Sequence, residues 1–558
     1  MRLRQNFPCF VRLTVAAALV VASLSSAQAQ GSDHYRMLHH LARARTDKGK
    51  IEGVYELDRT VRAFLGIPYA APPVGKLRWK PPQPHRKWFV RSATTFGPHC
   101  IQFGAFPDMI FRDPGASEDC LTLNVWTPSG AKPGSLPVMV WIYGGGFATG
   151  GTSEARQDGE FLAKRNVVVV SMNYRLGMLG FLALRSLADE SPQHAAGNYG
   201  LLDQAAALAW VRRNISGFGG DPNNITLFGE SAGSFSVSAQ MASPLSKDML
   251  AQAIGESGAG FFSSGLPWDP LKSREVSDAA LVKRYLGTDD LAALRKIPAE
   301  TLANTAAFRN FDAFPPDIDG YFLPASLPSI YAAGEEAHIP LLAGWNADEV
   351  RGMVLFAAVP VTTFSFTATA HQQFGVQADQ FLVLYPAAND PQAVQSAGDF
   401  AGDRFIAYST WRWLEAHVAT GEAPTYRYRF DLPSPTDPHH HSGSGAFHSD
   451  DIEYVFGTLD SRAGTHWRPQ DRALSDLMQQ YWTNFARNGN PNAPDLPQWP
   501  TYQAQTDWQV MHLNSDSEAQ PDAQRARYLF LDSVWGRSPS NSRGGPPGSN
   551  ASNPPANK

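Results

Sequence analysis

The sequence predicts an α/β protein in which a mainly parallel central sheet is covered by helices, with helical cap insertions. Two observations lead to this fold class. Short apolar runs rich in β-branched residues alternate with helical stretches between about residues 137 and 235. The runs at 138–143 and 167–173 are apolar on both faces, which is typical of strands buried between two layers of helix.

The remaining elements follow in order along the chain. Residues 200–215 carry an apolar stripe with helical spacing. Residues 218–222 contain glycine and proline, which interrupt regular secondary structure, and residues 225–228 are expected to form another buried strand. Helical and proline-containing pieces dominate residues 271–340, which we expect to form a cap over the sheet. Further strands are expected at 340–345 and 425–432, and an amphipathic helix at 471–488 that ends at Gly489.

The two ends of the chain differ from its globular middle. Residues 1–29 are typical of an export signal, because arginines precede an apolar run and Ala27-Gln28-Ala29 supplies the small residues for cleavage after Ala29. A membrane anchor is the alternative, but the run is shorter than the roughly 20 residues that span a bilayer. Residues 538–558 are expected to form a disordered tail. We therefore predict one folded domain over 30–537 in a secreted or periplasmic protein.

The charge of the chain argues against nucleic acid as a partner. The formal net charge is −5, and the signal contributes three arginines and no acids, so the mature chain is near −8. Nucleic-acid binding requires a basic face, which this balance does not favour. We expect no membrane-spanning segment in the mature chain, and the sequence leaves the oligomeric state open.

The cysteines favour a disulfide. Cys9 lies in the predicted signal, which leaves Cys100 and Cys120 in the mature chain. One such pair suits a bridge in an oxidising compartment. A metal site is the weaker alternative, because two thiols lack nearby histidines or cysteines to complete a tetrahedral set. We predict the disulfide, and no metal or cofactor.

A candidate nucleophile lies in the segment Gly229-Glu230-Ser231-Ala232-Gly233. The segment follows the strand at 225–228 and precedes a helix-compatible run, which is the context that a GxSxG nucleophile turn requires. The two glycines permit a sharp turn that exposes the hydroxyl of Ser231. Ser257, in Gly255-Glu256-Ser257-Gly258, lacks the second spaced glycine and is expected to be structural.

A glycine run upstream predicts an oxyanion hole. Gly144-Gly145-Gly146 follows the first clear strand, and consecutive glycines can turn backbone amides toward a ligand without obstruction. We expect the amides of Gly145, Gly146 and Ala232 to bind the oxyanion of an acyl-transfer reaction. A plain turn is the alternative.

A serine hydroxyl needs a neighbouring base, and the base needs an orienting carboxylate. His448 is the candidate base, since it lies in a glycine-containing loop just before the apolar piece 452–456. The residues alone also allow a merely solvated loop histidine, and they do not name the acid.

At this point the sequence resembles the type B carboxylesterases, a family that includes cholinesterases and related lipases. The resemblance extends from about Gly53 to Trp535. It rests on several long motifs, namely Phe64 to Ala70 with Pro72 to Gly75 and Leu77 to Trp79, Glu118 to Trp126, Asn173 to Arg175, Phe218 to Pro222, and the nucleophile segment itself.

The resemblance implies an α/β-hydrolase fold and hydrolysis of small-molecule carboxylic esters through a serine acyl-enzyme. It implies His448 as the base, because Phe447-His448 before residues 451–457 matches the family's histidine block. Gly344 to Glu349 is similar to the family's acid segment, which implies Glu349 as the acid and leaves Asp348 as its competitor. Ser257 matches a family serine near the triad, and Glu230 is expected beside it. Cys100 and Cys120 resemble the family's first disulfide.

Three departures bear on the pocket. Val350 stands where a glycine usually follows the acid, and Ser234 replaces the glycine common after the nucleophile turn. The segment between the two cysteines holds Phe103, Phe106 and Phe111 but no tryptophan, so choline esters are not the expected substrates. A non-catalytic adhesion module and a lipase are the alternative functions, and the three candidate catalytic residues together disfavour the first.

Overall fold

The computed structural model describes residues 41–536 except 105, 107, 262–267, 306–312, 356, 422 and 437–442. The export signal predicted at 1–29 and the tail predicted at 538–558 lie outside the described residues. Both remain predictions, and so do the limits of the domain.

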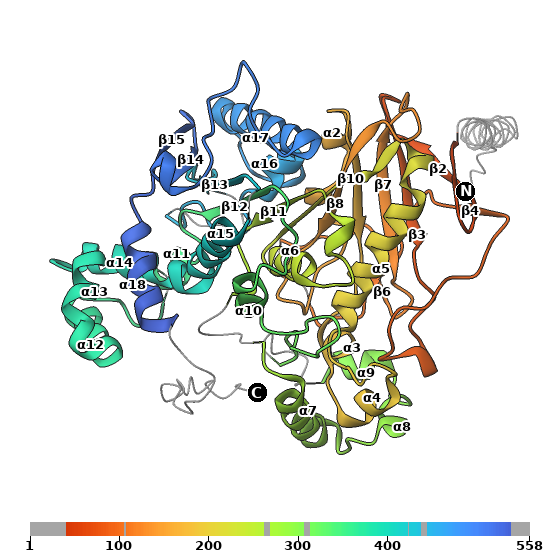
Figure 1. Ribbon diagram of the computed structural model, residues 1–558, viewed down its shortest axis with the longest axis horizontal. Coiled ribbons are helices and arrows are strands. Elements are labelled where there is room, and N and C mark those ends of the chain that lie inside the picture. The colour runs from red at the N-terminus through yellow and green to blue at the C-terminus, as the bar shows by residue number, and fades with distance from the viewer. Residues whose placement is uncertain are drawn as a thin grey trace, which may run out of the picture.

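One large sheet runs through the molecule (Figure 1). Within the described ranges it has thirteen strands, one of which, β4 (Val90–Ser92), pairs with β2 outside the main path. The path runs β1 (Ala42–Thr46), β2 (Gly49–Tyr55), β3 (Val61–Pro68), β7 (Thr122–Pro128), β9 (Val168–Met172), β8 (Leu136–Ile142), β10 (Gly220–Glu230), β11 (Gln252–Glu256), β12 (Leu341–Asn346), β13 (Thr425–Phe430), β14 (Gln509–Leu513) and β15 (Glu518–Pro521). β5 (His99–Cys100) and β6 (Ala116–Ser117) form a separate pair.

The middle of the sheet is parallel, which confirms the predicted fold class. The pairs from β9 through β8, β10, β11, β12 and β13 to β14 are all parallel, whereas β1, β2, β3 and β7 pair antiparallel. Every residue of β9 and of β11 is buried, as strands between two helical layers must be.

The interruption of regular secondary structure that the sequence predicts at 218–222 is only partly confirmed. Gly220 already pairs with Leu136, and the register then shifts before Ile225. An irregularity of this kind allows glycine and proline to lie at the start of a strand.

Helices cover both faces of the sheet. A side chain at Gly255 would point toward Trp413 of α15 (Tyr408–Thr420) and Ser234 of α6 (Ala232–Ala242). The next residue, Glu256, accepts a hydrogen bond from Trp482 of α17 (Pro469–Asn488). Since successive strand residues point to opposite faces, α6 and α15 lie on one face and α17 on the other. The helices of the core and its edges are α2 (Glu160–Ala163), α3 (Gly177–Phe181), α4 (Arg185–Glu190), α5 (Tyr199–Asn214), α6 (Ala232–Ala242), α15 (Tyr408–Thr420), α16 (Ile452–Phe456), α17 (Pro469–Asn488) and α18 (Arg525–Trp535).

The helix predicted at 471–488 is observed as α17. It begins with Pro469, and Gly489 follows it at φ 75°, the left-handed conformation that a glycine adopts easily at a helix end. The segment 271–340 is helical as expected, with α7 (Leu271–Leu286), α8 (Leu291–Leu294), α9 (Ala299–Ala303) and α10 (Leu327–Ala332).

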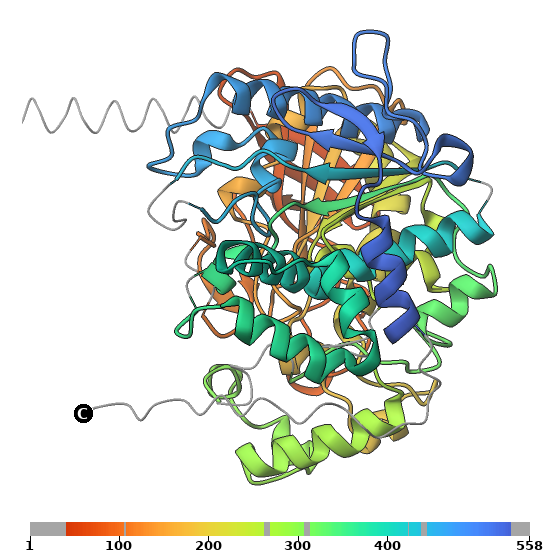
Figure 2. The same cartoon turned by 90° about the vertical axis from the view of Figure 1, so that its left-hand side faces the viewer.

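A second helical insertion lies at a position that the sequence analysis did not predict. We call residues 351–402 the arm; it lies between β12 and β13 in the sequence and contains α11 (Arg351–Leu355), α12 (Thr363–Phe374), α13 (Ala378–Leu384) and α14 (Asp390–Gly402). The arm forms the lobe at the left of Figure 1, and Figure 2 looks onto it. No helix in the described residues is both long and apolar enough to cross a membrane.

Candidate active site

The turn at Ser231 has the geometry of a nucleophile elbow. Ser231 lies between β10 and α6 with φ 54° and ψ −124°, a backbone conformation that is rare for residues other than glycine. A side chain at Gly229 would lie 2.7 Å from the carbonyl carbon of Gly233, and one at Gly233 would lie 2.0 Å from the carbonyl oxygen of Ile142. Helix and strand therefore approach so closely that only glycine fits on either side of the serine.

Ser231, His448 and Glu349 form a continuous chain of hydrogen bonds. Ser231 Oγ lies 2.8 Å from Nε2 of His448, and Nδ1 of His448 lies 2.6 Å from Oε2 of Glu349. Ser231 follows β10, Glu349 follows β12 and His448 follows β13. The carboxyl ends of these parallel strands lie at the same edge of the sheet. This arrangement can pass the serine proton to the histidine and stabilise the resulting imidazolium.

Ser257 and Asn346 hold the second oxygen of Glu349. The hydroxyl of Ser257 donates to Oε1 over 2.6 Å, and the backbone amide of Asn346 donates to the same atom over 2.8 Å. Glu349 is buried, so these donors replace the water that the carboxylate has lost. Ser257 is thus in direct contact with the predicted acid.

Asp348, the competing candidate acid, binds the loop before the histidine instead. Its carboxylate accepts hydrogen bonds from the amide of Ala446 over 3.2 Å and from Arg351 over 3.0 Å. Two backbone hydrogen bonds continue this pairing. The amide of Asp348 donates to the carbonyl of Ala446, and the amide of His448 donates to the carbonyl of Glu349, each over 2.9 Å. The acid loop and the histidine loop are therefore joined as a short ladder.

Glu230 lies on the serine side of the imidazole. Its Oε1 is 3.3 Å from Nε2 of His448, and the side chain is almost fully buried. Burial raises the pKa of Glu230 to about 8, against the opposing effect of His448, and Asp451 and Glu349 add to the rise. For His448, burial acts to lower the pKa, but the carboxylates of Glu230 and Glu349 outweigh it and hold the pKa above its ordinary value.

Asp451, Asn346 and Tyr428 lie near the triad and were not predicted as site residues. Asp451 is buried beneath the histidine loop, where it accepts hydrogen bonds from Tyr428 over 2.9 Å and from Asn346 over 3.1 Å. The side-chain amide of Asn346, which makes the bond to Asp451, also donates to the carbonyl of Phe447 over 2.7 Å. Burial, followed by the charge of Glu349, raises the pKa of Asp451 to about 6. The only signal for Asp451 was a charge beside the apolar run 452–456.

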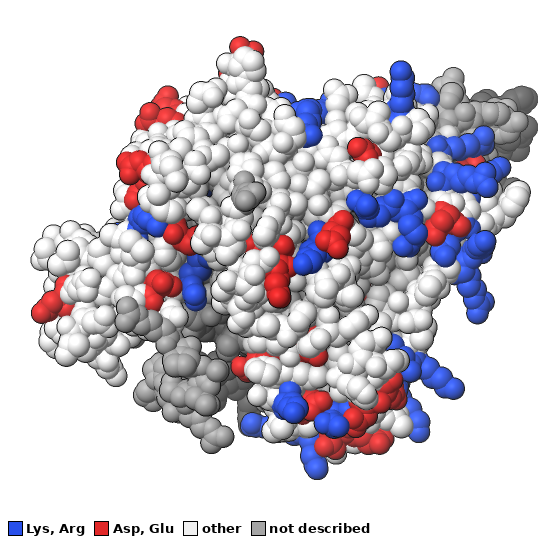
Figure 3. Space-filling model, viewed as in Figure 1, with Lys and Arg blue, Asp and Glu red and all other residues white. Residues whose placement is uncertain are grey.

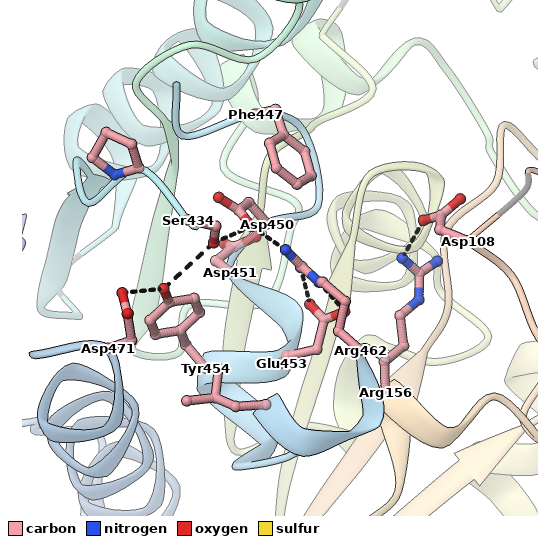
Figure 4. A network of polar contacts seen from close by, with 12 residues as sticks. Asp108, Arg156, Ser434, Phe447, Asp450, Asp451, Glu453, Tyr454, Arg462 and Asp471 are labelled. Carbon is pink, nitrogen blue, oxygen red and sulfur yellow. Dashed lines mark hydrogen bonds and ion pairs between the residues drawn. The ribbon is translucent and has the colours of Figure 1, made fainter. Parts of the chain in front are cut away.

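A polar network stabilises the chain after the histidine (Figure 4). Arg462 bonds Asp450 over 2.9 Å and Glu453 over 2.8 Å, and its guanidinium lies 5.5 Å from the ring of Phe447. Both acids are buried, so the network ties the two ends of the loop around His448 to the start of α16.

The glycine run packs against the elbow. A side chain at Gly144 would lie 2.9 Å from Cβ of Ser231, and one at Gly145 would lie 2.2 Å from the carbonyl oxygen of Thr149. Gly145 and Gly146 have φ values of 101° and 62°, which favour glycine. In the part of the chain that the structure describes, neither amide donates to a backbone or side-chain acceptor. Ala232 begins α6, and the first amides of a helix have no intrahelical acceptor.

Cys100 and Cys120 form the predicted disulfide, with their sulfurs 2.05 Å apart. Both sulfurs are used in this bond, which rules out a metal on this pair. The loop that it closes contacts the chain after the glycine run, because Gln102 donates to the carbonyl of Gly150 over 2.8 Å and accepts from the amide of Gly150 over 2.8 Å. Among the described residues, no group of three or more His, Cys, Asp and Glu side chains is placed to hold a metal ion.

Two of the three departures from the family pattern, Ser234 and Val350, differ in their surroundings. The hydroxyl of Ser234 donates to the carbonyl of Gly258 over 2.5 Å, so it links α6 to the residue after Ser257. Val350 is half-buried between Glu349 and α11, and nothing in the structure gives it a particular role.

Known proteins resemble this chain over nearly all of its described length. Residues 41–530 match the Carboxylesterase family. Fumonisin B1 esterase from Sphingopyxis macrogoltabida is 37% identical over 513 residues, which cover 88% of this chain and 89% of that protein. Para-nitrobenzyl esterase from Bacillus subtilis (strain 168) is 35% identical over 508 residues, covering 87% and 98%. Human (Homo sapiens) bile salt-activated lipase is 38% identical over 496 residues, covering 81% and 63%.

Proposed function

This chain belongs to the carboxylesterase family and is a serine ester hydrolase, and we propose that it cleaves carboxylic esters through an acyl-enzyme formed on Ser231. The observation that carries the proposal is the pair of hydrogen bonds from Ser231 to His448 and from His448 to Glu349, at 2.8 and 2.6 Å. The reaction needs no metal or cofactor, because the side chains of the protein supply the nucleophile, the base and the acid.

Acylation begins when Oγ of Ser231 attacks the carbonyl carbon of the ester and transfers its proton to Nε2 of His448. Glu349 stabilises the imidazolium through Nδ1. The amides of Gly145, Gly146 and Ala232 bind the oxyanion of the tetrahedral intermediate, and each such donor contributes about 3 kcal/mol of transition-state stabilisation. When the intermediate collapses, the ester C–O bond breaks and the alcohol leaves with the proton from His448.

Deacylation repeats these steps with water. His448 takes a proton from the water as the water attacks the acyl carbon, and the same amides bind the second oxyanion. Collapse releases the carboxylic acid and returns the proton to Oγ of Ser231. The enzyme therefore ends in its starting protonation state.

Aromatic side chains near the elbow support small-molecule esters with apolar groups as substrates. Phe147 directly follows the glycine run, and Phe235 lies one helical turn after Ser231, with ring centroids 6.4 Å apart. Trp268 lies 6.3 Å from the ring of Phe147. The loop closed by the Cys100–Cys120 disulfide contains no tryptophan, whose ring would bind the quaternary ammonium of choline. Choline esters are therefore not the proposed substrates.

Covalent labelling tests the nucleophile. An organophosphate should modify Ser231, and mass spectrometry of the digested protein should locate the label there. Label on Ser257 would reverse the choice. In parallel, esters of graded acyl length define the substrate class. A non-catalytic adhesion role has less support, because His448 lies within hydrogen-bonding distance of both Ser231 and Glu349.

We also propose that the folded domain extends over 30–537 and is exported through residues 1–29. The family match at 41–530 falls inside these limits, and the disulfide suits an oxidising compartment. N-terminal sequencing of the protein from its native host tests cleavage after Ala29.

A further inference from the structure

A π-helical turn, η7 (Asp403–Ala407), interrupts a long helix beside the candidate active site. α14, η7 and α15 follow one another without a gap from Asp390 to Thr420. The amide of Tyr408 donates to the carbonyl of Asp403, five residues back, whereas an α-helix bonds four residues back. The turn therefore holds one residue more than an α-helix would. Single π-turns within α-helices are rare, and they occur frequently at functional sites.

The turn contacts the proposed base, and the residue before it contacts the proposed acid. The ring of Phe405 meets the imidazole of His448 with centroids 5.1 Å apart and planes 72° apart, a T-shaped geometry that aromatic pairs favour. A side chain at Gly402 would lie 3.5 Å from Cβ of Glu349. Phe405 is 43% exposed, so the core of the protein does not require a large apolar side chain at this position.

Specific side chains stabilise the π-turn. Asp403 is buried and accepts a hydrogen bond from the hydroxyl of Tyr385 over 2.7 Å. The hydroxyls of Ser409 and Thr410 both donate to the carbonyl of Ile406, each over 3.0 Å. A change of helical register displaces carbonyl groups from their usual amide partners, so donors of this kind are needed to satisfy them. The turn is therefore fixed from the side chains around it.

The main charges that act on the histidine come from elsewhere. Burial acts to lower the pKa of His448, and the carboxylates that raise it belong to Glu230, Glu349 and Asp451, which lie outside both the arm and the turn. Figure 3 shows the arm, at the left of the view, as mostly uncharged surface. What the turn brings to the imidazole is therefore the contact with Phe405.

We propose that Phe405 is a positioning residue for the base, and that the π-turn holds it against His448 so that the imidazole stays in line between Ser231 and Glu349. This inference rests on the proposed function and adds a residue to it. The hydrogen bonds at the two ring nitrogens do not stop the imidazole from tilting about the line that joins them. The ring of Phe405 blocks this tilt on one side. A misplacement of about 1 Å in a catalytic arrangement can lower the rate by about a hundredfold.

The test compares single variants of the full mature chain. Phe405→Ala removes the ring, and Phe405→Tyr keeps it. Phe161→Ala is the matched control, because Phe161 of α2 is 41% exposed and its ring lies 5.0 Å from Nζ of Lys164 rather than on the triad. Steady-state kinetics with dissolved p-nitrophenyl acetate and p-nitrophenyl butyrate give kcat and KM. Phe405→Ala is also combined with His448→Ala.

We expect Phe405→Ala to lower kcat by about tenfold for both esters and to leave KM within about twofold, because the imidazole is misplaced while the substrate pocket is kept. Phe405→Tyr and Phe161→Ala should stay within about twofold of the wild type, as for surface changes generally. In the His448→Ala background, Phe405→Ala should cause no further loss, because a residue that acts through the histidine has no effect without it.

The melting temperature checks the fold of each variant. If Phe405→Ala is destabilised, Phe405→Leu replaces it, since leucine keeps most of the apolar volume without the ring, and the same loss of kcat is expected.

An unchanged kcat in Phe405→Ala would overturn the inference. So would a rise in KM that differs between acetate and butyrate, because Phe405 would then contact the acyl group, and so would an equal loss of activity with and without His448. If His448→Ala alone keeps wild-type activity, it is the proposed function that fails. An inactive His448→Ala beside an unaffected Phe405→Ala rejects only the role of Phe405.

Discussion

Ser257 donates a 2.6 Å hydrogen bond to Oε1 of Glu349, the carboxylate oxygen that does not face His448. The two residues are 92 positions apart in the chain, at the ends of neighbouring strands β11 and β12. The bond orients the carboxylate so that its other oxygen meets the imidazole. We therefore propose that Ser257 positions the carboxylate of Glu349.

Replacing Ser257 with alanine should lower kcat/KM by about tenfold, because a hydrogen bond to a charged group contributes about 1.5–3 kcal/mol and the amide of Asn346 remains. Steady-state kinetics on a dissolved ester measure the effect. Ser475→Ala is the matched control, since this buried serine bonds the backbone of Tyr454 away from the triad. Equal losses of activity in the two variants would show that the effect of Ser257 is not specific.

Ser231→Ala should reduce kcat by about four orders of magnitude or more without unfolding the protein, because the hydroxyl is the proposed nucleophile. The variant keeps Cβ and the turn. Circular dichroism and the melting temperature check the fold, and burst kinetics check acylation. Turnover above a few per cent in the folded variant would contradict the assignment of Ser231.

The pH dependence of kcat/KM should depend on Glu230. In the proposed mechanism neutral His448 is the base, so activity should fall as the pH drops through its pKa, which Glu230 and Glu349 hold above the ordinary value against the effect of burial. Glu230 is negatively charged above its pKa of about 8, so Glu230→Gln removes a charge in the range where His448 titrates, lowers the pKa of His448 and moves the acid limb to lower pH. Glu336→Gln, at a buried glutamate hydrogen-bonded to Thr420, is the control and should leave the limb in place. An unchanged limb in Glu230→Gln would show that this charge does not act on the base.

Cys100→Ser should lower the melting temperature and raise KM more than it lowers kcat. The bridge closes a loop with a sequence separation of 20, and a loop of that size stabilises the fold by about 3 kcal/mol in the chain-entropy model. The loop also bonds Gly150 beside the glycine run, so opening it should loosen the substrate site. Titration of the denatured, unreduced mature protein should find no free thiol, and two reactive thiols would disprove the bridge.

Gly445→Ala should disturb the histidine loop more than Gly443→Ala does. Both glycines have positive φ, 72° and 92°, so both variants introduce backbone strain of about 1–2 kcal/mol. A side chain at Gly445, however, would lie 2.1 Å from Oδ2 of Asp348, whereas at Gly443 the nearest atom is 3.8 Å away. We expect kcat/KM to fall about tenfold further in Gly445→Ala. Equal kinetics in the two variants would show that the contact with Asp348 does not position His448.

The fold class and the nucleophile turn could be predicted from local patterns in the sequence. Strands that are buried on both faces read as continuous apolar runs, and β8 and β9 were predicted to within about two residues. The turn at Ser231 could also be predicted. Its φ of 54° and the close approach of the strand and the helix require glycines at fixed positions on either side of the serine. Such signals are local, so a short stretch of chain carries them.

Which distant side chains meet becomes visible in the folded chain alone. His448 and Ser231 are 217 positions apart, and the residues alone could not separate Glu349 from Asp348, because both carboxylates follow the same strand. The family resemblance pointed to Glu349, and the folded chain places it on the histidine and Asp348 on the loop before it. The arm was missed for a related reason. Its helices α12 and α13 each bury one apolar side, but the attachment of the arm to α18 and to Glu349 depends on contacts between distant residues that no local pattern encodes.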